Sequence, residues 1–144
     1  MRFSLILSII LTLFIWGNSM LPADLSGASS GFVVNIVSDV FNFIRLDVDD
    51  DTLSLIIRKL AHFTEFFFLG ISLSIYFIKE KIEVYHIISL GFIVAVIDEF
   101  IQIFVDGRSG NVFDVGIDLL GIFVSLLFVY SIMKHLNRKT LKSS

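Results

Sequence analysis

Four long apolar runs constrain the fold of this chain more than any other feature. Each run approaches or exceeds the roughly 20 residues that an α-helix needs to cross the hydrocarbon core of a bilayer. The composition agrees, because 56% of the 144 residues are hydrophobic and the mean hydropathy is +0.89. A soluble domain is typically about 45–50% apolar. We therefore predict an all-α polytopic membrane protein with four transmembrane helices.

The predicted transmembrane helices follow the apolar runs and leave polar links between them. They cover about residues 3–20, 54–78, 83–104 and 112–133, and a basic tail fills residues 134–144. The first run could instead be a cleaved signal peptide, but Trp16 near its end suits an interfacial anchor, which favours a retained helix. A single membrane domain, 1–144, accommodates all of these segments.

Residues 31–46 show a different pattern, with apolar side chains on one helical face and Asn35, Asp39 and Asn42 on the other. Such a segment suits the membrane interface, so we predict a short amphipathic interfacial helix in the first outer loop. The alternative is a short helix that packs across the end of the bundle. The pattern favours neither placement over the other.

The absence of cysteine narrows the possible chemistry. A chain without cysteine forms no disulfide scaffold, no thiolate nucleophile and no thiolate metal site. The formal net charge of −3 is too small to indicate a polyanionic partner, so we expect no nucleic acid ligand. The expected environment is the lipid bilayer itself.

Basic residues gather on one side of the predicted bundle. Under the positive-inside rule, Arg2, Lys79, Lys81 and the basic tail all face the cytoplasm. This places both termini on the cytoplasmic side of the bacterial cell membrane. The polar ends of the second, third and fourth helices then meet at the outer face. Residues far apart in the sequence are therefore expected at one depth.

Each of the last three predicted helices carries polar residues at that outer end, and the link between the last two adds another. The set comprises Arg58, Lys59, His62, Glu65, Asp98, Glu99, Gln102, Arg108, Asp114 and Asp118. At about 100° per residue, Arg58, His62 and Glu65 share a sector of about 60° on one helix. Gly121 and Ser125 continue the stripe of the last helix, and such small residues permit close helix approach.

These ten residues include five carboxylates against three fixed cations and one histidine. Like charges in a medium of low dielectric are costly unless they are paired or bound to a cation, so the excess of acid favours an active or ion-binding site. The candidate catalytic residues are His62, Glu65, Asp98 and Glu99, and the other six are candidate ligand-binding residues. The alternative is a salt-bridge network that fixes the helices in register.

A divalent cation could bind in this carboxylate cluster, since His62, Glu65, Asp98 and Asp114 offer imidazole and oxygen ligands. The chain has no His-Glu-x-x-His motif, no second histidine nearby and no EF-hand spacing, so the cofactor stays undefined. The Gly-containing link at residues 105–111 could hold a phosphate or carboxylate on its N–H groups, or it could be a simple tight turn.

Four motifs, in order along the chain, resemble those of the VanZ-like family. They are Lys59-Leu60-Ala61-His62-Phe63-Thr64-Glu65, Asp98-Glu99-Phe100-Ile101-Gln102, Gly107-Arg108, and Asp114 with Asp118-Leu119-Leu120-Gly121. The combined set is specific, whereas any one motif alone would be weak. It extends from about residue 58 to residue 122, with a looser match at Trp16–Ser19. Phe66 stands where a tyrosine is expected, and Asp106 where the family often has proline, but no charged member is lost.

The resemblance implies a small bacterial membrane protein from a family named for low-level resistance to the glycopeptide teicoplanin. We therefore expect an envelope protein whose outward-facing polar pocket binds or acts on a cell-envelope lipid or a phosphate-bearing cell-wall precursor. Arg58, Lys59 and Arg108 would hold the anion. Two alternatives stay open: an ion- or proton-coupled transporter component, and a non-catalytic bundle that serves structure or binds a partner. Neither the polar residues nor the family resemblance specifies whether a reaction is catalysed.

Overall fold

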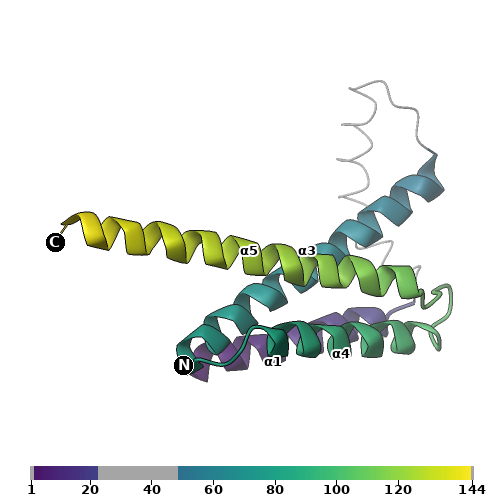
Figure 1. The fold of residues 1–144 in the computed structure, drawn as a ribbon. Coiled ribbons are helices and arrows are strands. Elements are labelled where there is room, and N and C mark those ends of the chain that lie inside the picture. Colours follow the sequence, from purple (N-terminus) through teal and green to yellow (C-terminus); the bar gives the residue numbers. More distant parts are fainter. Residues whose placement is uncertain (1, 23–48, 144) are drawn as a thin grey trace.

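The structure is a computed structural model that describes residues 2–22 and 49–143. Within these residues every regular element is a helix (Figure 1), which confirms the predicted all-α class. The helices are α1 (Arg2–Ser19), α3 (Asp50–Glu80), α4 (Tyr85–Gln102) and α5 (Val112–Ser143). The amphipathic helix predicted at residues 31–46 lies outside the described residues.

Three of the helices are long and apolar enough to cross a membrane. The qualifying segments are Thr52–Glu80, Tyr85–Gln102 and Val112–Leu136. The apolar part of α1, Phe3–Ser19, is shorter. At 1.5 Å per residue it rises about 26 Å, slightly less than the roughly 30 Å of a hydrocarbon core.

The ends of the helices differ from the predicted boundaries because apolarity marks the membrane stretch rather than the helix. The N-terminus of α3 is capped by Asp49, whose carboxylate accepts the Thr52 N–H at 2.9 Å. Its C-terminus is closed by Lys81 in the left-handed conformation, with φ of 58°. Helix α5 continues ten residues beyond position 133, because lysine, arginine and leucine are good helix formers in water as well.

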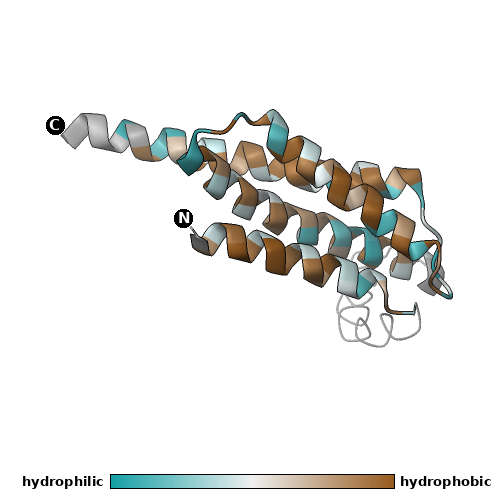
Figure 2. Ribbon diagram, turned by 90° about the horizontal axis from the view of Figure 1, so that it is seen from below, coloured by the Kyte–Doolittle hydropathy of each residue, from teal (hydrophilic) through white to brown (hydrophobic). Residues whose placement is uncertain are grey.

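Helix α3 packs most extensively against α5, while α1 and α4 lie alongside them (Figures 1 and 2). A Cβ atom at Gly121 would lie 2.5 Å from the carbonyl oxygen of Phe63, so the backbones of α5 and α3 are in contact there. A Cβ at Gly70 would likewise meet the Ser125 side chain. The close approach predicted from Gly121 and Ser125 is therefore confirmed.

Helix α1 is attached to the bundle by hydrogen bonds that reach its neighbours. Ser8 Oγ donates to Ser72 Oγ of α3 at 3.0 Å, and Ser72 Oγ donates to the carbonyl of Ser4 at 2.9 Å. We name these three residues the serine seam. The Trp16 Nε1–H donates to the carbonyl of Val94 of α4 at 3.3 Å, and its ring packs against the core. This tryptophan therefore contributes to helix packing, a role that the prediction of an interfacial anchor did not include.

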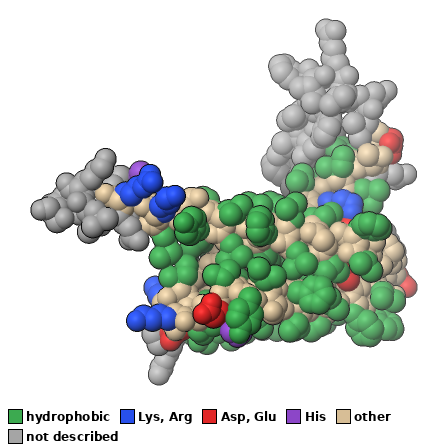
Figure 3. Space-filling view, in the orientation of Figure 1, with side chains coloured by type: hydrophobic (Ala, Val, Ile, Leu, Met, Phe, Trp, Pro, Cys, Tyr) green, Lys and Arg blue, Asp and Glu red, His purple; other side chains and the backbone are tan. Residues whose placement is uncertain are grey.

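The outer surface of the bundle is apolar along the membrane-crossing length of the helices. Hydrophobic side chains cover most of the face shown in Figure 3, and the charged side chains gather toward the two ends of the molecule. The buried core is also apolar, with Ile15, Phe66, Leu69 and Ile122 among its least exposed members. A surface as apolar as the interior suits a lipid environment better than water.

Candidate functional site

The polar stripes predicted on three helices meet at one end of the bundle. The end of α1, the N-terminal half of α3, the end of α4 and the start of α5 all contribute to it. Successive side chains on one helical face are one turn apart, about 6 Å along the axis, so the site has two levels. His62, Asp98 and Asp118 lie at the deeper level. Arg58, Gln102 and Asp114 lie on the same three helices, each four residues closer to this end of the bundle.

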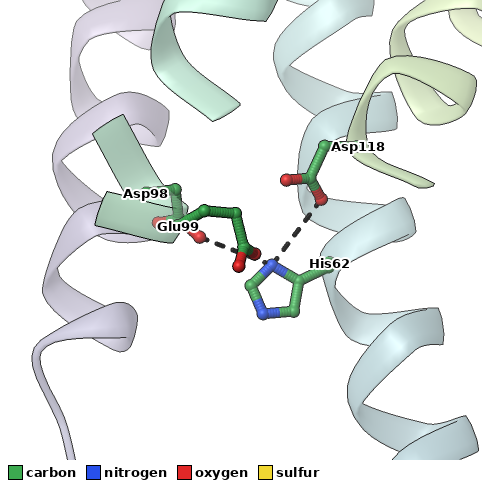
Figure 4. A group of neighbouring side chains, drawn as sticks. All are labelled: His62, Asp98, Glu99 and Asp118. Atoms are coloured by element: carbon green, nitrogen blue, oxygen red, sulfur yellow. Dashed lines mark ion pairs between the residues drawn. The ribbon is translucent and has the colours of Figure 1, made fainter. Parts of the chain in front are cut away.

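At the deeper level, four residues from three helices form what we name the acid–His cluster: His62, Asp98, Glu99 and Asp118 (Figure 4). One nitrogen or oxygen atom from each lies within 4.8 Å of the corresponding atoms of the others. His62 Nδ1 is 3.6 Å from Asp98 Oδ2 and 3.7 Å from Asp118 Oδ1. Asp98 and Asp118 are fully buried, and His62 and Glu99 are at most 8% exposed. All four residues are among the ten candidates from the sequence, but of the four suggested metal ligands only His62 and Asp98 belong to this cluster, without Glu65 and Asp114.

The acid–His cluster leaves several buried polar atoms without hydrogen bonds. The described residues contain five such side-chain atoms, and four belong to the cluster: His62 Nδ1, Asp98 Oδ1, Asp118 Oδ1 and Asp118 Oδ2. The distances from His62 to the two aspartates exceed those of ordinary hydrogen bonds. Leaving a buried polar group unsatisfied costs about 1–3 kcal/mol, and more if it is charged. The geometry of the cluster therefore calls for a further partner at its centre.

Gln102 and Asn111 fix the two carboxylates that α4 contributes. Gln102 Nε2 donates to Asp98 Oδ2 at 2.9 Å and reaches Glu99 Oε1 at 3.4 Å and Ser19 Oγ at 3.3 Å. The backbone N–H of Asn111 donates to Glu99 Oε2 at 2.7 Å. Both oxygens of Glu99 therefore have a donor, and the side chain is held facing His62 and Asp118.

Three half-buried cations form the outer level, which we name the cationic rim: Arg58, Lys59 and Arg108. Lys59 forms an ion pair with Asp114, the acid one turn outward from Asp118. Arg108 donates its Nε–H to the carbonyl of Leu21 at 2.9 Å and an Nη2–H to the carbonyl of Asn18 at 3.1 Å. Arg58 has no hydrogen bond or ion pair with any residue that the structure describes. Among the described residues, Arg58 is therefore the cation of the rim without a partner.

Arg58 and Arg108 are close enough to influence each other's charge. Burial lowers the pKa of the Arg108 guanidinium below its ordinary value, and the positive charge of Arg58 lowers that pKa further. Nearby carboxylates, with Asp98 first, act in the opposite direction. Arginine stays protonated at physiological pH, so two mutually repelling guanidinium groups share this side of the site.

Glu65 lies apart from the acid–His cluster, although it shares a face of α3 with His62. Its Oε1 accepts a hydrogen bond from Asn18 Nδ2 of α1 at 2.7 Å. The structure thus brings nine of the ten predicted residues into the cluster and the surrounding shell, and turns Glu65 toward α1.

Three polar residues of the site were not among the predicted ones. Asn18 holds Glu65 and Arg108, Ser19 meets Gln102, and Asn111 donates its N–H to Glu99. Asn18 and Ser19 are the only polar pair at the end of an otherwise apolar run, which was a usable signal. The contribution of Asn111 comes from its backbone, for which its side chain gives no signal.

Two apolar grooves described in the structure lie away from the acid–His cluster. One, of about 280 Å³, lies between α1 and α3 and is lined by residues such as Leu11 and Phe68. The other, of about 700 Å³, lies between α3, α4 and α5 toward the opposite end and is lined by Ile87 and Leu126 among others. No member of the cluster lines either groove. The acid–His cluster itself is buried, and the residues of the cationic rim are half-buried.

This arrangement can perform two kinds of chemistry. The acid–His cluster combines an imidazole with three carboxylates, groups that exchange protons or coordinate a cation. The cationic rim presents guanidinium groups, whose planar forks match the oxygens of phosphate and carboxylate. An anion at the rim would lie about one helical turn from the cluster.

Comparison with known proteins supports the family resemblance. A family model described as VanZ/LLP1 matches residues 3–134, which is most of the chain and includes every residue of the acid–His cluster and the cationic rim. No curated protein and no solved structure gives a match. On the extent of the family match, this chain is a member of the VanZ/LLP1 family.

Proposed function

We propose that this protein binds the phosphate-bearing head group of a cell-envelope lipid or lipid-linked cell-wall precursor at its polar end. Through that ligand it would contribute to resistance against teicoplanin-type glycopeptides, as the family name suggests. The observation that carries the proposal is Arg58, a half-buried arginine without a partner among the described residues, held next to Arg108. Two adjacent guanidinium groups that repel each other are stabilised by an anion between them.

The orientation of the bundle in a bacterial cell membrane supports an external ligand. Exposed basic residues lie at the end opposite the site: Lys79, Lys81, Lys134 and Arg138. Under the positive-inside rule this end faces the cytoplasm, together with both termini. The polar end then faces outward, at the level of lipid head groups on the outer leaflet.

The members of the site would have separate roles. Arg58 would make the first contact with the phosphate, and Arg108 would add a second from the loop between α4 and α5. Lys59 is already paired with Asp114, so its contribution would be to position α3 against α5. If a proton is transferred, His62 with Asp98 is the candidate pair, and its Nδ1–Oδ2 distance of 3.6 Å would have to shorten to hydrogen-bond distance or be bridged by a water.

A pair of matched lipids tests the proposal directly. The full chain is reconstituted in nanodiscs, and binding of a polyprenyl phosphate is compared with binding of the corresponding polyprenol. We expect the phosphate lipid to bind more tightly, and Arg58→Gln to weaken its binding about ten-fold or more, the effect of losing one charge-assisted contact of about 1.5–3 kcal/mol. Arg138→Gln, which removes an exposed arginine at the opposite end, serves as the control.

The outcome separates this function from a purely structural network. Equal affinity for the phosphate lipid and the alcohol, or equal loss in the Arg58 and Arg138 variants, would contradict a head-group site. In cells, teicoplanin susceptibility should rise in the Arg58→Gln strain at unchanged protein level. A variant that protects cells as well as the wild type would remove the link with resistance.

A further inference from the structure

We propose that the acid–His cluster holds one divalent transition-metal ion. The ligands would be His62 Nδ1 and one carboxylate oxygen from each of Asp98, Glu99 and Asp118. This inference deepens the proposed function, because it assigns a cofactor to the level beneath the cationic rim. His62 comes from α3, Asp98 and Glu99 from α4, and Asp118 from α5, so the metal would bind between these three helices.

The positions of the four groups carry the first step. Their ligand atoms lie within 4.8 Å of one another, and Figure 4 shows the side chains converging on a common point. Around a metal bonded at about 2.0–2.2 Å, neighbouring ligand atoms lie roughly 3–4 Å apart. Side-chain rotations that move each atom inward by roughly 1 Å or less would therefore complete the coordination.

The unsatisfied atoms carry the second step. His62 is 8% exposed and its Nδ1 has no hydrogen-bond partner, although it points toward two carboxylates. Both oxygens of the fully buried Asp118 also lack a partner. Serines elsewhere in the bundle show that this chain satisfies buried polar groups where they serve packing. A cation at the centre would satisfy the nitrogen and the oxygens together.

The balance of charge carries the third step. Around the site stand five carboxylates, Glu65, Asp98, Glu99, Asp114 and Asp118, and three cations, Arg58, Lys59 and Arg108. With all five carboxylates counted as ionised, as metal binding would require, and with His62 counted as neutral, the positive charges are two short of the negative ones. One divalent cation would make the set neutral. Neutrality matters because unpaired charge buried in a medium of low dielectric is strongly disfavoured.

The ligand set indicates the class of metal. An imidazole nitrogen suits zinc, iron and nickel, while carboxylates suit manganese and magnesium, so a mixed set of one nitrogen and three oxygens favours Zn²⁺ or Mn²⁺. The ligands are also oriented from outside, as metal ligands usually are: Gln102 donates to Asp98, and the N–H of Asn111 donates to Glu99.

The test measures metal on the full chain without any lipid ligand. Protein purified in detergent is stripped with EDTA and titrated with Mn²⁺ and Zn²⁺, and bound metal is followed by electron paramagnetic resonance for Mn²⁺ and by elemental analysis for Zn²⁺. We expect one ion per chain. Asp118→Asn and His62→Gln should each weaken binding by about ten-fold or more, since each removes a ligand.

Matched controls are available at positions outside the cluster, the exposed Asp106 and the half-buried His86. Asp106→Asn removes an acid from the nearby loop, and His86→Gln removes a histidine near the start of α4; both should bind metal as the wild type does. If Asp118→Asn does not fold, His62→Gln decides the question. Stoichiometry well below one ion in the wild type, or equal affinity in the site and control variants, would overturn the proposal.

Failure of the metal site and failure of the head-group site can be told apart. Polyprenyl phosphate binding is measured on EDTA-treated protein and again after Mn²⁺ is restored. Lipid binding that depends on Arg58 but not on metal would overturn the metal proposal alone, provided that titration also shows no bound ion. Bound metal without preference for the phosphate lipid would overturn the head-group proposal alone.

Discussion

The serine seam and the acid–His cluster are both buried polar contacts between helices, but they are built differently. In the seam, Ser8 and Ser72 each donate to a partner at about 3 Å, and the groups are neutral. In the cluster, the ionisable groups of His62, Asp98 and Asp118 approach one another without reaching hydrogen-bond distance. Polar groups that only stabilise a fold form hydrogen bonds within it, whereas a ligand site contains polar atoms without a partner in the protein.

The largest loss of stability should come from separating α3 from α5. Helix α3 contributes residues to both the serine seam and the acid–His cluster, and α5 contributes Asp118 to the cluster. Gly121→Val places a Cβ atom 2.5 Å from Phe63 O and 3.1 Å from Phe67 N, both backbone atoms that cannot rotate away. We expect the free energy of unfolding to fall by about 1–3 kcal/mol or more, measured by denaturant titration in micelles.

Gly116→Ala is the control for this substitution. No atom lies within 4 Å of the new Cβ at Gly116, so stability should stay the same or rise by about 0.5–1 kcal/mol from the better helix propensity of alanine. A Gly121→Val protein as stable as the wild type would show that the contact between α3 and α5 is not needed.

The second effect should be opposite in sign and confined to the cluster. Asp118→Asn replaces one of the clustered carboxyl groups by an amide of nearly the same shape. Measured without metal, the variant should be more stable than the wild type by about 1 kcal/mol, because an amide does not ionise and so avoids the cost of a carboxyl buried beside Asp98 and Glu99. A variant clearly less stable than the metal-free wild type would show that Asp118, like the serine seam, stabilises the fold.

The smallest effect should come from the seam itself. Ser72→Ala removes the donor to Ser4 O and the acceptor of the Ser8 hydroxyl, at a cost of about 1 kcal/mol. Metal and lipid binding should not change. Ser131→Ala, which removes an exposed bond within α5 only, should cost almost nothing. A loss of metal binding in the Ser72 variant would show that the two regions are coupled.

The sequence was sufficient for the helices and for most of the site, because hydropathy marks membrane spans and helical periodicity marks shared faces. It was less accurate for Glu65 and Glu99. Helical geometry grouped Glu65 with His62, and both glutamates were candidate catalytic residues, yet only Glu99 lies in the cluster. The side chain of Glu99 is held inward by Gln102, its i, i+3 neighbour on α4, and by the N–H of Asn111, which lies in the following loop, where helical periodicity gives no information.

The contribution of α1 was also beyond prediction from sequence. Ser4, Ser8 and Thr12 recur every four residues and mark one face of α1, but the pattern does not say which helix that face meets. Asn18 and Ser19 reach the site because Trp16 and the serine seam set the rotation of the helix. The depth of the cluster below the rim depends in turn on how four helix ends pack, which no local rule specifies.

Arg108 gives this bundle a mechanical property. Its guanidinium joins the loop between α4 and α5 to backbone carbonyls 87 and 90 residues earlier in the chain, at the end of α1. Side-chain substitutions at Leu21 or Asn18 leave those carbonyls in place, so these two hydrogen bonds of Arg108 do not depend on which residues stand there. An anion that draws the guanidinium toward Arg58 competes with the carbonyls of α1. Under the proposed function, ligand binding and the packing of α1 would therefore be linked, and each would shift the equilibrium of the other by the same free energy.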